Sequence, residues 1–171
     1  MTTSLDIAAW LVSHHGNNAS LSNLSLNKLC YFAQVTALST DGKTLFDDDI
    51  QAWEYGPVCP AVYHAYKHYG RLPVRAPESH VPTLSERENR IMEKTWEKYG
   101  WLSPFDLVRL SHRKGCAWSK TYKAGENATI SPQLILDSDD VKGFDASATF
   151  AHAVIETKAR YSNTLRLLED S

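Results

Sequence analysis

Residues 26–38 constrain the fold more than any other part of the chain. Their apolar side chains, among them Phe32 and Val35, point in more than one direction around a helix. A helix that is apolar on nearly all sides is normally surrounded by other elements. The sequence therefore predicts a central core helix here, with Asn23 or Ser25 as the residue that caps its beginning.

Capping and turn residues separate this stretch from further helical segments. Ser85 and Glu88 have the spacing of a capping box, and Ser103-Pro104 reads as an N-cap followed by proline at the first helical position. The spacing of apolar residues predicts further helices near residues 5–12, 58–69, 86–99 and 147–168. Residues 50–53 suit a short strand, and residues 129–130 can lie beside it. The predicted fold class is mainly α, a compact multi-helix domain with at most a small two- or three-stranded sheet.

The composition limits the classes of protein to which this chain can belong. The 171 residues are 43% hydrophobic and 22% charged, as expected of one globular domain. Apolar runs are too short for a membrane span, and the N-terminal residues lack the pattern of a signal peptide. Cys30, Cys59 and Cys116 form no Cys-x-x-Cys pair, so we expect a reducing, cytoplasmic setting without a disulfide framework or a cysteine zinc site. The net charge of −2 argues against a surface built for nucleic acid.

Few residues suggest catalysis or metal binding. His64 and His68 have the i, i+4 spacing of metalloprotease ligands, but Ala65 stands where the general-base glutamate would be. Cys59 lies at a helix start, where the helix dipole could lower the pKa of its thiol. We interpret the histidines as ordinary side chains and the cysteines as packing residues. The sequence therefore predicts no enzyme, no cofactor and no metal site.

A modest basic stretch lies at residues 111–123. It is the one candidate for a DNA-recognition helix, which needs several basic and amide residues on one exposed face. The stretch is short, so we do not expect the protein to bind nucleic acid on its own.

Aromatic side chains flank a turn at residues 53–58. Two interpretations are open for Trp53 and Tyr55: they anchor the turn in the core, or they stay exposed and serve as binding anchors. The first is the one that we favour from the sequence.

Several segments resemble one known family. Residues 27–34 (NKLCYFAQ) are similar to its KLLYFAQ helix, and residues 50–63 (IQAWEYGPVCPAVY) to its AW-x-YGPV-x-P signature. Weaker matches follow at residues 96–103 and 110–118. On these motifs the chain is identified as a member of the Panacea domain, the SocA-type antitoxin family, over about residues 5–136. The signature residues of this chain are Lys28, Tyr31, Phe32, Trp53, Tyr55, Gly56, Pro57, Val58, Pro60 and Tyr63.

The resemblance implies an antitoxin of a type II toxin–antitoxin system that neutralises its cognate toxin by direct contact. It also implies two alternatives: an adaptor that delivers the toxin to the ClpXP protease, or a DNA-binding regulator of its own operon. The family has no catalytic residue and no cofactor. Its members pair with unrelated toxins, so the resemblance names no particular target.

Residues 137–171 follow this Panacea domain as an acidic loop and an amphipathic helix, which we expect to pack on the same domain. Apolar residues recur along one side of the helix, interrupted by Thr157 and Lys158. The stripe either completes the core or binds the toxin as a helix in a groove. The candidate toxin-binding residues are Phe150, Val154, Tyr161, Leu165 and Leu168.

Overall fold

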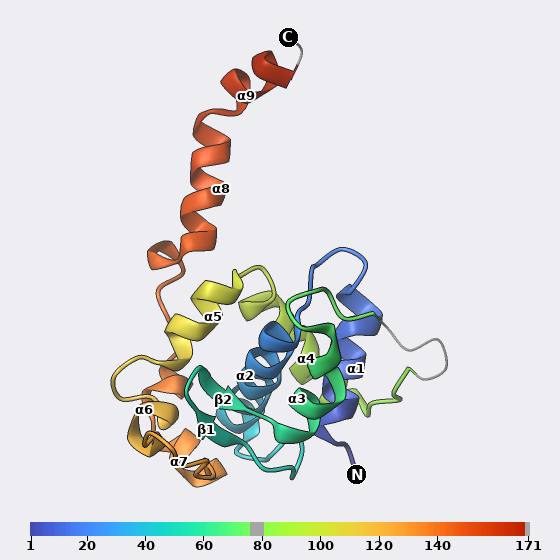
Figure 1. The fold of residues 1–171 in the computed structure, drawn as a ribbon, viewed down its shortest axis with the longest axis vertical. Coiled ribbons are helices and arrows are strands. Elements are labelled where there is room, and N and C mark those ends of the chain that lie inside the picture. The colour runs from blue at the N-terminus through green and yellow to red at the C-terminus, as the bar shows by residue number, and fades with distance from the viewer. Residues whose placement is uncertain (76–80, 170–171) are drawn as a thin grey trace.

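The computed structural model describes residues 1–75 and 81–169, except that the side chains of residues 163–165 and 168 are not described. It consists of a helical body and an arm that rises away from it (Figure 1). Helix α2 (Asn23–Asp41) runs through the centre of the body and is buried along most of its length. The predicted core helix is thus confirmed, although Ser22 rather than Asn23 or Ser25 is its N-cap.

Shorter helices surround α2. They are α1 (Ser4–His15), α3 (Pro60–Tyr66), α4 (Glu86–Tyr99), α5 (Pro104–Ser111) and α7 (Pro132–Leu136). Capping boxes begin α4, through Ser85 and Glu88, and α5, through Ser103 and Asp106. The sequence pattern predicted the first box and the Ser103 cap, but not the part that Asp106 plays. A 3₁₀ turn, η1 (Lys67–Tyr69), completes the segment predicted as a helix over residues 58–69.

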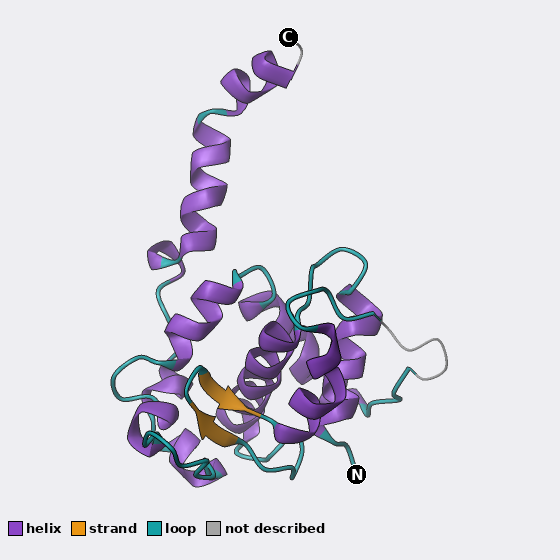
Figure 2. Cartoon of the chain, viewed as in Figure 1, coloured by secondary structure: helices purple, strands orange, loops and turns teal. Residues whose placement is uncertain are grey.

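The described residues form one two-stranded antiparallel sheet, β1 (Gln51–Trp53) and β2 (Gly56–Val58), drawn in orange in Figure 2. Trp53 pairs with Gly56 beside the tight turn. Residues 128–130 lie along β1, where the amide of Ala52 donates to the Ala128 carbonyl over 2.9 Å. The mainly α fold with a small sheet is therefore confirmed.

The body extends beyond residue 136, where the sequence placed the end of the domain. Helix α6 (Ala117–Thr121) and the 3₁₀ turns η2 (Asp139–Lys142) and η3 (Ala146–Ala148) complete it. Asp140 is 1% exposed and its carboxylate accepts a 2.8 Å hydrogen bond from the Tyr31 hydroxyl on the central helix. The acidic loop is thus tied into the core rather than free.

The arm differs from the single helix predicted over residues 147–168. It contains two helices, α8 (Phe150–Arg160) and α9 (Ser162–Glu169), which are separated at Tyr161. Every residue of α8 is described, and none is buried. Helix α8 meets the body at η3 and α5, where Phe150 and Ala151 donate to Asp106, and none of its residues is buried, so the arm does not pack along the domain as expected.

Candidate functional site

Gly56 and Pro57, at the centre of the family signature, lie against the side chain of Lys28. Its ammonium group lies inside the body with no exposed surface and donates a 3.0 Å hydrogen bond to the Pro57 carbonyl. Burial lowers the pKa of Lys28 to about 7, because desolvation disfavours the charged form. One lysine of the central helix thus holds the second strand of the hairpin.

Gly56 makes room for this lysine. Its φ is +107°, a conformation that side chains rarely adopt, and a Cβ here would lie 2.9 Å from Lys28 Cε and 2.8 Å from Ser111 Oγ. The close approach of three elements at this point explains why glycine stands between Tyr55 and Pro57. Gly56 and Pro57, at the centre of the YGPV motif, therefore have a structural role.

Asparagine side chains extend the same network along α2. Asn27 Oδ1 accepts from the Cys59 amide over 3.0 Å, and Asn27 Nδ2 donates to the side chain and carbonyl of Asn23. Asn23 Nδ2 in turn donates to the Tyr63 carbonyl over 3.2 Å. The sequence patterns predict Asn23 only as a candidate cap and give Asn27 no such role, although amides in an otherwise apolar helix are a signal of buried backbone partners.

The turn of the hairpin is held from its other side by α6. Trp118 Nε1 donates a 2.8 Å hydrogen bond to the Trp53 carbonyl, and the ring of His112 lies 3.9 Å from that of Trp118. His112 Nε2 is 3.4 Å from the Glu54 carbonyl. Three blocks of the family pattern, far apart in the chain, thus meet around one turn.

The remaining signature residues divide into buried and exposed ones. Tyr31 and Phe32 are buried, and the ring of Phe32 stacks on that of Tyr99 at 4.4 Å. Val58 is also buried, and Pro60 opens α3 at its first position.

The aromatic residues of the turn lie at the surface. Tyr55 is 67% exposed and Trp53 is half-buried, so the prediction that both anchor the turn in the core is wrong for Tyr55. The turn redirects the Tyr55 side chain outward while Gly56 and Pro57 remain inside. Trp53, Tyr55, Tyr63 and Leu24 line an open pocket of about 740 Å³.

The candidate nucleophile is not activated. Burial raises the pKa of the Cys59 thiol to about 12, so the helix start does not lower it, and its complete burial agrees with the interpretation as a packing residue. Cys30 and Cys116 are buried as well. His64 and His68 lie exposed on the surface, and in the described part of the chain no three His, Cys, Asp or Glu side chains gather as a metal site requires.

Basic residues of the stretch at residues 111–123 make hydrogen bonds within the body. Arg113 Nη1 donates to the Gly143 carbonyl over 2.9 Å, and Lys120 Nζ donates to the Asp137 carbonyl over 3.0 Å. Its helix, α6, has five residues. A groove-reading helix needs a longer exposed basic face than this stretch offers.

The arm carries the residues predicted to bind a toxin. Phe150 is 55% exposed and Tyr161 is 51% exposed, whereas Val154 is half-buried. Ile155 and Leu167, which the sequence analysis did not select, are 55% and 68% exposed. The side chains of Leu165 and Leu168 lie outside the described residues.

Comparison with known proteins identifies the family to which the chain belongs. The family described as "Antitoxin SocA-like, Panacea domain" matches residues 26–119, more than half of the chain, and the chain belongs to this family. Antitoxin SocA of Caulobacter vibrioides (strain NA1000 / CB15N) is 32% identical over 109 residues, which cover 57% of this chain and 58% of that relative. The match therefore spans less than two thirds of either protein. No solved structure matches the chain. None of the described helices has the length and apolar composition needed to cross a membrane.

Proposed function

We propose that this protein is an antitoxin that neutralises a cognate toxin by direct binding, as in type II systems. Its membership of the SocA-like family and the name of its relative, Antitoxin SocA, support this role. The matched region contains the Lys28 network, which builds the body. The toxin-specific surface is then expected elsewhere.

The arm is the observation that carries the proposal. Soluble monomers rarely leave a group of large apolar side chains uncovered unless the group meets a partner. Phe150 and Ile155 on α8, and Tyr161 at its C-cap, are each more than half exposed. Their spacing places Phe150 and Tyr161 on one side of the arm and Ile155 on another. An isolated helix of this length is marginal in water, so a bound partner would also stabilise it. We propose that the toxin covers these three side chains, the apolar surface of the arm.

We propose a binding mechanism rather than a catalytic one. The buried thiols, with the pKa of Cys59 raised to about 12, do not suit nucleophilic attack at neutral pH. The histidines at residues 64 and 68 belong to no larger cluster among the described side chains. Thiols that stay reduced fit the proposed cytoplasmic location.

The test is rescue of cells that express the product of the adjacent reading frame. The full chain and a chain that ends at Thr149 are each co-expressed with it, and growth, melting temperature and co-purification are measured. We expect the shortened chain to fold, because Thr149 is the last buried residue of the body in the described chain. It should fail both to rescue and to co-purify.

Two outcomes would change the proposal. Full rescue by the folded, shortened chain would contradict the role of the arm. Rescue by the full chain with loss of toxin protein, abolished in cells that lack ClpXP, would indicate the adaptor mechanism instead of simple inhibition.

A further inference from the structure

The root of the arm is a junction between two helix beginnings. The first amides of α8 have no partner within their own helix, as at any helix start. Phe150 N donates to Asp106 Oδ1 over 2.7 Å, and Ala151 N donates to Asp106 Oδ2 over 2.9 Å. His152 N donates to the Thr149 hydroxyl over 3.2 Å. The arm thus begins on a carboxylate that belongs to the body.

The same carboxylate already caps α5. Asp106 is the third residue of that helix, and its Oδ2 accepts from the Ser103 hydroxyl over 2.9 Å and from the Ser103 amide over 3.3 Å. One side chain therefore receives four hydrogen bonds and faces the positive ends of two helix dipoles. Asp106 is 2% exposed.

The charge of Asp106 is stabilised where it lies. Burial alone would raise the pKa of this carboxyl, but the amides of Ala151 and Phe150, together with Ser103, outweigh burial and lower the pKa. Charge-assisted bonds of this kind are shorter and stronger than neutral ones. The carboxylate therefore remains ionised at neutral pH and holds both helices.

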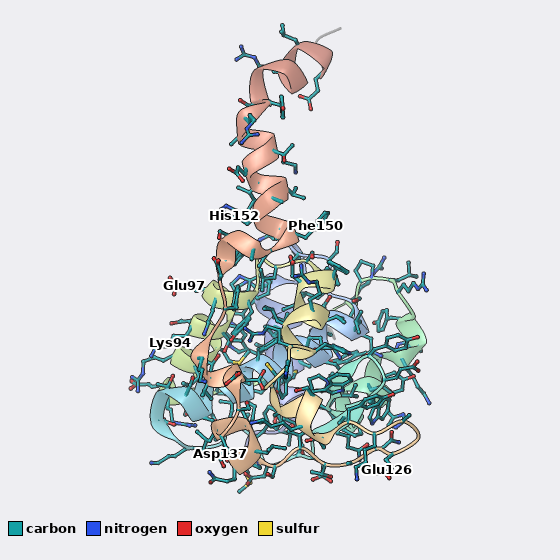
Figure 3. The ribbon with its side chains drawn as sticks, turned by 90° about the vertical axis from the view of Figure 1, so that its left-hand side faces the viewer. Lys94, Glu97, Glu126, Asp137, Phe150 and His152 are labelled. Carbon is teal, nitrogen blue, oxygen red and sulfur yellow. The ribbon has the colours of Figure 1, made fainter. Side chains whose placement is uncertain are left out.

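Little else fixes the direction of the arm. The rings of Phe105 and Phe150 meet edge to face at 6.5 Å, and Ala151 touches the core. Figure 3 shows Phe150 and His152 at the foot of the arm, where it leaves the body. None of the α8 residues beyond this first turn is buried, so the angle of the arm is set at the root.

We infer that Asp106 is a positioning residue, which sets the arm at a fixed angle to the body and thereby presents the apolar surface of the arm to the toxin. The inference rests on the proposed function for its last step only. Asp106 lies within the matched family region and the arm lies outside it. The body thus provides one attachment point, Asp106, that can hold different arms. A pre-set arm loses less conformational entropy on binding than a loose one.

The geometry is tested without the toxin. Nitroxide labels are placed at Lys94→Cys on α4 and Thr157→Cys on α8, two exposed positions, while the native cysteines are buried. Pulsed electron spin resonance then reports the distance distribution between body and arm. We expect one narrow distribution in the parent and a broad one in Asp106→Asn, in which an NH₂ group replaces one acceptor oxygen.

Ser103→Ala is the matched control. It removes the hydroxyl that caps α5 but leaves the bonds from Asp106 to Phe150 and Ala151 in place. It should lower the melting temperature about as much as Asp106→Asn while keeping the narrow distribution. An equally narrow distribution in Asp106→Asn, or an equally broad one in Ser103→Ala, would overturn the positioning role.

Binding to the product of the adjacent reading frame is measured second. We expect Asp106→Asn to weaken binding about ten-fold and Ser103→Ala to leave it unchanged. A broadened arm with unchanged affinity would retain the positioning role of Asp106 for the arm and contradict the toxin contact. A narrow arm with weakened affinity would contradict the inference itself.

Discussion

The signature turn and the arm use polar and apolar groups in opposite ways. Around Lys28, buried and half-buried polar groups join elements that are distant in sequence, as Asn27 does with Cys59 and Trp118 with Trp53. Along α8, apolar side chains are exposed, and the first backbone amides donate to Asp106 of the body. The buried network specifies one arrangement of the body, and the exposed apolar side chains leave surface for a partner. The two regions should therefore respond to mutation in different measurements.

The largest effect is expected at Gly56. In Gly56→Ala the new Cβ would meet Lys28 and Ser111 and would also hold a strained positive φ, so we expect a loss of about 3 kcal/mol or more in unfolding free energy. Gly42→Ala is the control, because its φ is +73° but no atom lies within 4 Å of the new Cβ. It should lose about 1–2 kcal/mol. Urea unfolding that gives equal losses would show that strain alone, without crowding, explains Gly56.

Lys28 predicts a specific pH dependence. Its pKa is about 7 in the folded protein and 10.5 when exposed, so unfolding takes up a proton between these values and stability rises with pH. From pH 7 to 8.5 this group should add about 1.5 kcal/mol to the unfolding free energy. Lys28→Met should remove the rise. The buried tyrosines and cysteines, whose pKa values are raised, make stability fall as the pH rises. The interval from pH 7 to 8.5 stays below their ordinary pKa values, where this opposite effect is small. A parent whose stability is flat over it would contradict the lowered pKa.

A pair of tyrosines compares the two regions directly. Tyr31→Phe removes the hydroxyl that donates to Asp140, a buried carboxylate whose other oxygen has no hydrogen-bond partner among the described residues, and should cost about 1–2 kcal/mol. Tyr161→Phe removes an exposed hydroxyl in the arm and should leave the melting temperature unchanged. Thermal unfolding of both variants checks this. Equal shifts would mean that the arm is more tightly bound to the body than its exposure indicates.

The sequence predicted the features that depend on residues close together in the chain. The apolar surface of α2, the capping box of α4, the Ser103 cap of α5 and the bridge at residue 129 follow from spacing within a few residues. Ser22 was missed because three residues capable of capping stand close together, and the entry angle of the chain selects among them. The partner of Lys28 lies 29 residues away, at a distance that periodicity does not reveal.

The arm shows what local sequence patterns do not reveal. Amphipathic spacing established that one side of residues 147–168 is apolar, but it carries no information on whether that side meets its own domain or another protein. Asp106 was read neither as a cap of α5 nor as a cap of α8, since the second role joins residues 44 positions apart. The break at Tyr161 has no glycine or proline to signal it.

The smallest effect on stability, and the sharpest contrast, is expected at Ile155. Its side chain is 55% exposed on α8, so Ile155→Ala should change the unfolding free energy by less than about 0.5 kcal/mol. If the toxin covers the apolar surface of the arm, the same change should weaken binding by about 1–2 kcal/mol, because partly desolvated aliphatic contacts at an interface lose their partner atoms. Thr157→Ala, two residues on and also exposed, controls for the effect of any substitution in the helix. Calorimetric titration of the toxin into each variant separates the cases. Equal affinities for the parent and Ile155→Ala would move the contact away from the side of the arm that carries Ile155, and the exposed Tyr55 at the signature pocket would then be the next surface to test.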